Sequence, residues 1–114
     1  MKLEQIQKLF VGTWKGTDNG SYIPGEVNSW IVTRKSDETF VIKFTTFYSN
    51  GEVDNTEEIG TWRIEDNTYI ELREDLSEDT YFFNFVTPNS IHFIDASESD
   101  PNPYNFIDYR ILLD

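Results

Sequence analysis

The hydrophobic periodicity of this chain changes once, close to its start. Apolar residues at positions 3, 6, 9 and 10 recur at helical spacing, which predicts a short amphipathic helix over residues 3–10. After Val11 the period becomes two, and no second helical pattern follows. Strands without helices between them pair with their sequence neighbours in an antiparallel arrangement. The clearest alternating runs place these residues inward: Phe40, Ile42, Phe44, Tyr81, Phe83 and Phe85.

Turn residues divide the rest of the chain into about eight strands. Asp-Asn-Gly at 18–20, Ser-Asn-Gly at 49–51 and Asp-Asn at 66–67 supply side chains that tolerate tight or left-handed geometry. A meander of this size either closes or stacks, and closure removes exposed strand edges. We therefore expect an all-β fold, an antiparallel up-and-down β-barrel of about eight strands with the N-terminal helix closing one end. A sandwich or an open roll is the alternative.

The tripeptide Gly-Thr-Trp occurs twice, at 12–14 and at 60–62. The match continues into the acidic turns and the strands that follow, so 36–40 also aligns with 77–81. Either an ancestral unit was duplicated, or similar strands and turns converged on similar residues. In both cases the matched positions are expected to face the same way.

Composition limits the classes of partner. The chain has 114 residues, no cysteine, and 9 basic against 21 acidic side chains for a formal charge of -12. Such a charge repels phosphate backbones and anionic lipids, so nucleic acid and membranes are not expected partners. We expect one domain over residues 1–114 in the cytoplasm, since cysteine is absent and residues 1–10 lack the apolar run of a signal peptide or membrane span.

Leu9, Gly12, Trp14 and Arg110 carry a resemblance to the calycin group, in particular to small bacterial lipocalin-like domains. The resemblance implies that Trp14 follows the helix at the closed end of the barrel and that Arg110, from the last strand, packs across its indole. It thus implies that Gly12, Trp14 and Arg110 are structural barrel-closure residues. Alternation leaves two options for that strand: either Ile107 and its alternate neighbours face inward, or Arg110 does so with its own.

The segment that contains Gly16, Gly20, Tyr22 and Pro24 also resembles, more weakly, the opening of nitrobindin-type barrels. That family ligates haem iron through a histidine on a late strand. The only histidine here is His92, in the expected penultimate strand. We expect His92 to be a partly exposed strand residue and the protein to carry no cofactor.

Catalytic and metal-binding patterns are absent from the sequence. No serine lies in a Gly-x-Ser-x-Gly setting and no glycine-rich phosphate loop occurs. Asp95, Ser97 and Ser99, with Asp100, carry side-chain oxygens at the alternate spacing of calcium ligands. The glycine and the distal glutamate of a calcium loop are missing. We expect no catalytic residues and no metal site, and an enzymatic role is the less favoured reading.

Two functions remain. The first is a non-enzymatic binding protein that holds a small apolar or aromatic ligand in a narrow barrel cavity. Arg34, Tyr22, Tyr81 and Tyr104 are its candidate polar anchors, although each aromatic residue can equally be plain core. The alternative is an acidic interaction module that binds a basic protein through its outer surface, as inhibitors and immunity proteins do. The candidate cavity residues are Trp30, Arg34, Phe44, Tyr81, Phe83 and Tyr104.

Overall fold

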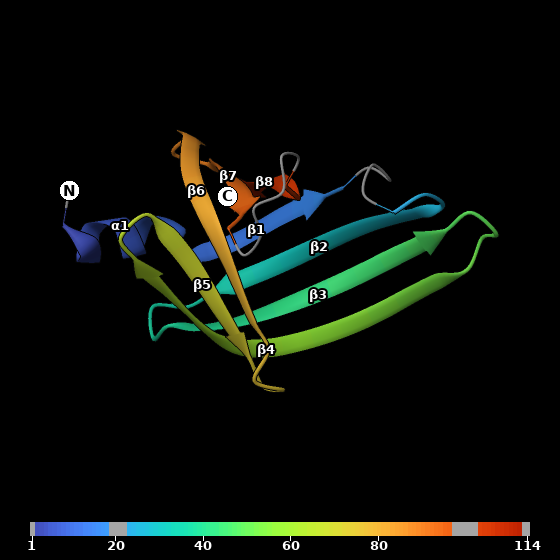
Figure 1. Cartoon of the computed structure of the whole chain (residues 1–114), viewed down its shortest axis with the longest axis horizontal. Helices are drawn as coiled ribbons and strands as arrows, with labels where there is room; N and C mark the ends of the chain where they lie inside the picture. The colour runs from blue at the N-terminus through green and yellow to red at the C-terminus, as the bar shows by residue number, and fades with distance from the viewer. Residues whose placement is uncertain (1, 19–22, 97–102, 113–114) are drawn as a thin grey trace.

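The computed structural model describes residues 2–18, 23–96 and 103–112. One helix, α1 (Leu3–Phe10), precedes eight strands that form a closed antiparallel barrel in sequence order. Figure 1 shows the strands curling around one another with α1 at one end. The expected fold is therefore confirmed. The strands are β1 (Gly12–Thr17), β2 (Glu26–Arg34), β3 (Thr39–Tyr48), β4 (Val53–Glu65), β5 (Thr68–Arg73), β6 (Glu78–Thr87), β7 (Ser90–Asp95) and β8 (Asn105–Arg110).

The helix closes its end of the barrel mainly through its last residue. Phe10 is fully buried, stacks on Tyr69 at 5.5 Å between ring centroids and meets Phe83 edge-on at 5.0 Å. Such aromatic contacts add to the energy of burial itself. The first turn contributes less than its periodicity predicts, because Leu3 remains 49% exposed. The apolar face of α1 therefore reaches the core from Ile6 onward and not at Leu3.

The barrel closes through a short ladder between β1 and β8. Only two pairs of residues are in register there, Trp14 with Arg110 and Lys15 with Tyr109. Beyond Lys15 the two strands are no longer paired. This seam is the narrowest connection in the wall and exposes part of the inner layer to the outside.

The alternation in β8 resolves the choice that the sequence left open. Asp108 is buried and Phe106 packs against the core, whereas Tyr109 is 51% exposed. Arg110 therefore lies on the inner side of the strand, as the calycin-like pattern requires, and the option that places Ile107 and Tyr109 in the core is wrong. A buried aspartate is tolerated at such a position only where it is paired.

Candidate functional site

A connected set of polar side chains crosses the interior of the barrel. Arg34 at the end of β2 donates from Nη2 to Asp108 Oδ2 on β8 at 3.2 Å, and from Nε to the Tyr69 hydroxyl on β5 at 2.8 Å. The Tyr69 hydroxyl donates to Glu71 Oε2 at 2.7 Å, and Trp30 Nε1 donates to Asp108 Oδ1 at 2.7 Å. These five residues are called the Arg34 network below.

Alternation along three strands places the network inside. Its members share the inner face with the core residues of β2, β5 and β8, and all five are buried. Arg34 is 3% exposed and Asp108 is 1% exposed, so neither charge has bulk water as a partner. The Arg34 guanidinium also lies over the rings of Tyr69 at 4.8 Å and Phe93 at 5.3 Å. Pairing and ring contacts together offset the cost of removing these charges from water.

Burial shifts the protonation equilibria of the network. It raises the pKa of the Glu71 carboxyl, against the opposing effects of the Arg34 charge and the Tyr69 hydrogen bond. It likewise raises the pKa of Asp108, which Arg34 and the Trp30 hydrogen bond oppose. Burial alone lowers the pKa of Arg34, but its polar and acidic neighbours outweigh that effect and raise it. Arg34 therefore stays protonated, and the two carboxyls hold a proton more tightly than they would in water.

One donor of the network is unused. Arg34 Nη1 is buried and has no hydrogen-bond partner among the described residues. An unpaired buried donor costs roughly 1–3 kcal/mol, more when it is charged. The rest of the guanidinium is held in place by Tyr69 and Asp108, so the two N–H bonds of Nη1 have fixed directions. A ligand that brings an acceptor to this point removes the penalty.

The network lines a small cavity, which we call the inner cavity. Its volume is about 60 Å³, the space of roughly two water molecules. Buried polar groups form its inner part, and half-buried aromatic side chains form its outer part. Those aromatic side chains are Phe44, Tyr81, Tyr104 and Phe106.

Five of the six candidate cavity residues come together here: Trp30, Arg34, Phe44, Tyr81 and Tyr104. The sixth does not, because Phe83 packs against Phe10 at the helix-closed end of the barrel. Tyr22, a candidate polar anchor, lies outside the described residues. Burial, with the charges of Asp79 and Glu71, raises the pKa of the Tyr81 hydroxyl, which keeps it protonated and able to donate.

Sequence reasoning missed three members of the network, Tyr69, Glu71 and Asp108. A signal was present in the spacing. Glu71 is two positions from Tyr69 and Asp108 is two positions from Phe106, so each acid shares a face of its strand with an aromatic residue. Because acidic residues are mostly solvated, the sequence alone predicts that both of these lie at the surface.

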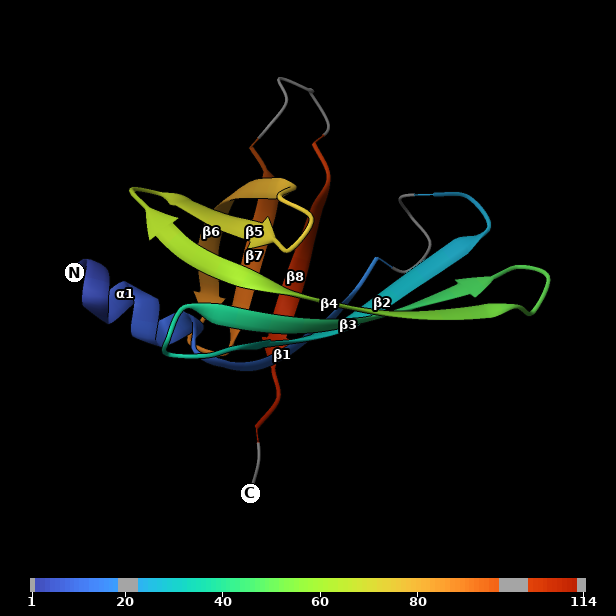
Figure 2. The same ribbon diagram turned by 90° about the horizontal axis from the view of Figure 1, so that it is seen from below.

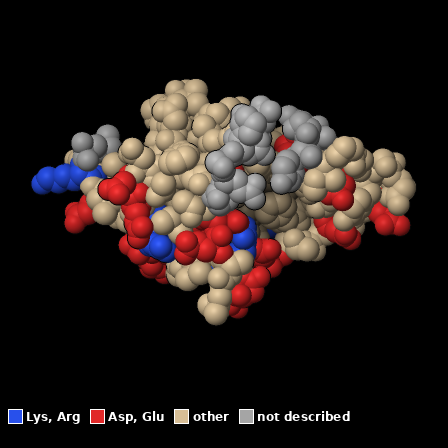
Figure 3. Space-filling view, in the orientation of Figure 1, with Lys and Arg blue, Asp and Glu red and all other residues tan. Residues whose placement is uncertain are grey.

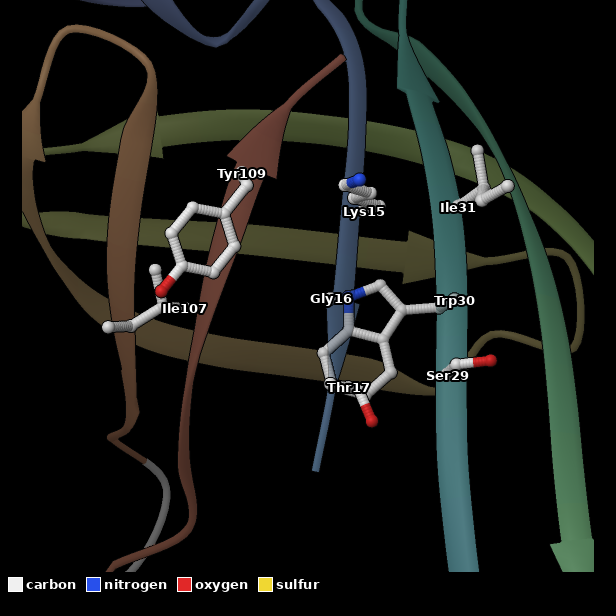
Figure 4. A pocket seen from close by; sticks show the side chains of 8 residues that line it. All are labelled: Lys15, Gly16, Thr17, Ser29, Trp30, Ile31, Ile107 and Tyr109. Carbon is white, nitrogen blue, oxygen red and sulfur yellow. The ribbon is translucent and has the colours of Figure 1, made fainter. Parts of the chain in front are cut away.

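A larger groove lies on the outside of the seam between β1 and β8. Its volume is about 540 Å³, and Figure 4 shows its lining from β1, β2 and β8. The lining contains outward residues of those strands together with Gly16 and Trp30, which belong to the inner face. We call it the seam groove. Its polar side chains are exposed or half-buried, so it lacks the fixed, desolvated donor that the inner cavity has.

The three barrel-closure residues are in mutual contact. Arg110 Cζ lies 4.2 Å from the centre of the Trp14 ring, and its Nη1 and Nη2 donate to the carbonyl oxygens of Val11 and Leu9 at 2.8 and 2.7 Å. Gly12 has φ of +135°, and a Cβ there would lie 2.7 Å from Arg110 Nη1. Glycine therefore suits both the backbone conformation and the close approach of the guanidinium.

The remaining candidates show no constellation of reactive groups. His92 is half-buried on β7 and its Nε2 lies 3.1 Å from Asn105 Oδ1. Within residues 2–18, 23–96 and 103–112, no group of three or more His, Cys, Asp and Glu side chains is placed to hold a metal ion. Of the segment with alternating oxygen ligands, Ser97, Ser99 and Asp100 lie outside the described residues.

Comparison with known proteins finds similarity in structure and none in sequence. No protein-family model matches the chain, and no curated protein sequence matches it. Among solved structures it is similar to a de novo designed fluorescence-activating β-barrel, with a TM-score of 0.57 and 17% sequence identity over 97% of this chain and 100% of that one. At that identity the similarity shows the barrel fold.

The described part of the chain holds no helix of the length and apolarity that crossing a membrane requires.

Proposed function

We propose that the protein binds a small ligand with an aromatic body and one neutral hydrogen-bond acceptor, such as a ketone or an amide. The observation that carries this proposal is Arg34, which lines the inner cavity and whose buried Nη1 has no hydrogen-bond partner among the described residues. A few fixed polar groups within apolar surroundings are characteristic of small-molecule sites. The acceptor occupies the inner cavity, and the attached ring lies against the half-buried aromatic side chains at its outer part.

The charge of the network favours a neutral acceptor over a carboxylate. Arg73 also lines the cavity, but its charge is paired outside the network with acidic residues of β4 and β6. Within the network, Arg34 contributes one positive charge, and the ionised carboxyls of Glu71 and Asp108 contribute two negative charges. The sum is negative when both are ionised and zero when one is protonated. A ligand carboxylate would therefore enter a site without net positive charge, and would lose its hydration as it did so. A carbonyl oxygen takes the same hydrogen bond at a lower desolvation cost.

Size limits the ligand as well. A cavity of roughly 150 Å³ accommodates benzene, whereas the inner cavity measures about 60 Å³. The cavity therefore takes the acceptor group itself, and the aromatic residues at its outer part, including Tyr81 and Phe106, contact the ring. We expect single-ring ligands and weak affinity for anything larger.

The test uses three probes that differ in one group: acetophenone, ethylbenzene and benzoate. Chemical-shift titration of ¹⁵N-labelled protein should show acetophenone binding at least tenfold more tightly than either of the others. Equal binding of acetophenone and ethylbenzene would show that no acceptor is recognised and would overturn the proposal. Tighter binding of benzoate would overturn the preference for a neutral acceptor.

Two variants assign the preference to a residue. Arg34→Met should abolish the difference between acetophenone and ethylbenzene, whereas Arg63→Met, which removes a partly exposed arginine of β4, should keep it. The comparison of probes on the unmodified protein stands even if the Arg34 variant does not fold.

Two finer assignments belong to the same proposal. Membership of the calycin group is supported by the contact between Trp14 and Arg110, which that resemblance implies. A cytoplasmic setting is in keeping with the lack of cysteine.

A further inference from the structure

Strand β4 is longer than the neighbour that covers it. Its residues 53–61 pair with β3, whereas β5 pairs with it only from Gly60 to Glu65. The segment Val53–Glu58 is thus paired on one side alone within the described residues, and we call it the open edge. Figures 1 and 2 show β2, β3 and β4 extending together away from the helix-closed end, with β4 at the border. Open edges in a closed barrel are sites where another strand can add.

The direction of the backbone groups follows from two hydrogen bonds. Trp62 N donates to Glu38 O on the β3 side of β4, while Ile59 O accepts from Glu74 N on the β5 side. In an antiparallel strand, alternate residues direct both of their backbone groups to the same side. The register between β3 and β4 is unbroken over this stretch. Val53, Asn55 and Glu57 therefore direct their N–H and C=O groups to the open side.

Two kinds of side chain border the open edge. Val27, Phe47 and Val53 are cross-strand neighbours on the outer face and are 38%, 46% and 49% exposed. Acidic side chains follow along the edge, and a groove of about 400 Å³ lies at its end near β5. Figure 3 shows acidic side chains gathered along that border of the molecule. The groove is lined by Glu57, Glu58, Ile59, Arg73, Glu74 and Asp75.

The charge of the open edge determines which kind of partner it attracts. Residues 53–59 contain Asp54, Glu57 and Glu58 and no basic side chain, and the nearby Arg73 is engaged with Glu58 and Asp79. A second copy of this chain, edge to edge, would bring these acids together in a protein of charge -12 and would be repelled. A basic segment is attracted to the same surface.

From the open edge, its acids and the apolar row we infer that β4 binds a partner protein by strand addition, through an extended segment in which Lys or Arg alternates with apolar residues. The backbone of the segment pairs with Val53, Asn55 and Glu57. Its apolar side chains lie beside the outer row of Val27, Phe47 and Val53, and its basic side chains face Asp54 and Glu58. This site is separate from the inner cavity and does not depend on it.

The probe is a fluorescein-labelled peptide of sequence Lys-Val-Lys-Val-Lys-Val-Lys, followed by fluorescence anisotropy at low salt. Asn55→Pro removes an edge N–H at a position where proline is compatible with an edge strand. Asn55→Ala keeps that N–H and is the matched control. We expect the proline variant to weaken binding at least tenfold and the alanine variant to change it less than twofold. Equal effects, or no binding of the peptide, would overturn the inference.

Hydrogen exchange of the unmodified protein supplies a second readout that needs no variant. Saturating peptide should slow exchange of the Val53, Asn55 and Glu57 amides at least tenfold and leave the Asp54 and Thr56 amides, which face β3, unchanged. Uniform or absent protection would show binding by charge alone and contradict strand addition. Sedimentation that revealed a dimer abolished by Asn55→Pro would assign the edge to a second copy and would also contradict it. None of these outcomes bears on acetophenone binding in the inner cavity, so the two proposals can fail separately.

Discussion

The guanidinium carbon of Arg110 lies 4.2 Å from the centre of the Trp14 ring, and two of its nitrogens donate to carbonyl oxygens of Val11 and Leu9. The end of the last strand is thereby tied to the junction between α1 and β1. Trp14 completes the connection, because its Nε1 donates to Phe10 O at 2.9 Å. One arginine thus joins the two ends of the barrel wall where the ladder between them is shortest.

Replacing Arg110 should weaken this closure. Arg110→Ala removes the cation above the indole and both hydrogen bonds to carbonyl oxygens, and we expect it to lower the free energy of unfolding by roughly 2–4 kcal/mol. Arg110→Lys keeps a charge but cannot make the forked contacts, and should lower it by about half as much. Urea denaturation followed by tryptophan fluorescence measures both. Equal stabilities of the Arg110→Lys and wild-type proteins would show that the paired guanidinium hydrogen bonds do not stabilise the fold.

The buried pair of Arg34 and Asp108 should show strong energetic coupling. Arg34→Met leaves the Asp108 carboxylate buried without its main partner, and the loss is expected at about 3–5 kcal/mol. Asp108→Asn leaves the cation unpaired instead. The double variant should lose less than the sum of the two single losses, because neither charge then remains alone. A double-mutant cycle in urea measures this coupling, and strictly additive losses would refute it.

Glu71 should make stability depend on pH with a defined sign. Burial raises the pKa of this carboxyl above the ordinary value of 4.5, so the folded protein holds the proton more tightly than the unfolded chain. The stability contributed by this site is therefore full below pH 4.5 and is lost as the pH rises through the raised pKa.

Glu71→Gln removes this titration and keeps an oxygen that accepts from Tyr69. We expect the variant to be more stable than the wild type at pH 8 and the advantage to shrink toward pH 4. Urea denaturation across this range measures the difference, and Glu65→Gln, at an exposed position, controls for the loss of one surface charge. A Glu71→Gln advantage that stays constant with pH would count against a buried titrating group.

Gly16 should be intolerant of even a methyl group. A Cβ at this position would lie 2.6 Å from the Trp30 ring, closer than carbon atoms pack, so Gly16→Ala must displace the indole. We expect a loss of about 1–3 kcal/mol in the free energy of unfolding and a shifted Trp30 indole N–H resonance as its bond to Asp108 is disturbed. Lys15→Ala, with an exposed side chain, is the control. An unchanged indole resonance in Gly16→Ala would contradict the close packing.

The strand pattern predicts which side chains face inward, but it does not predict how deep along the barrel they lie. Phe83 and Tyr81 lie on the same face of the same strand. Phe83 nevertheless packs against Phe10 of the helix, whereas Tyr81 lines the inner cavity. Depth depends on the register between strands, which arises from the whole ladder. The helix, the antiparallel meander and the inward aromatic residues follow from local periodicity alone and agree with the structure.

The Arg34 network and the open edge required the three-dimensional structure. Glu71 and Asp108 read as ordinary acidic residues until their partners, distant in sequence, are seen beside them. The open edge arises because β4 extends beyond β5, and the unequal length of two strands is not a local signal. The repeated Gly-Thr-Trp also conceals different contacts, since Gly12 adjoins Arg110 and Gly60 adjoins Leu72 O.

The central proposal is that a ligand is held at Arg34 inside the barrel. Its most direct test is titration of acetophenone into protein in which the arginine side-chain nitrogens and the aromatic rings are resolved by NMR. We predict a saturable shift of the Arg34 guanidinium resonances, with contacts from the ligand to Tyr81 and Phe106. Saturable shifts confined to Lys15, Ile107 and Tyr109, which line the seam groove, would place the ligand outside the barrel and contradict the account.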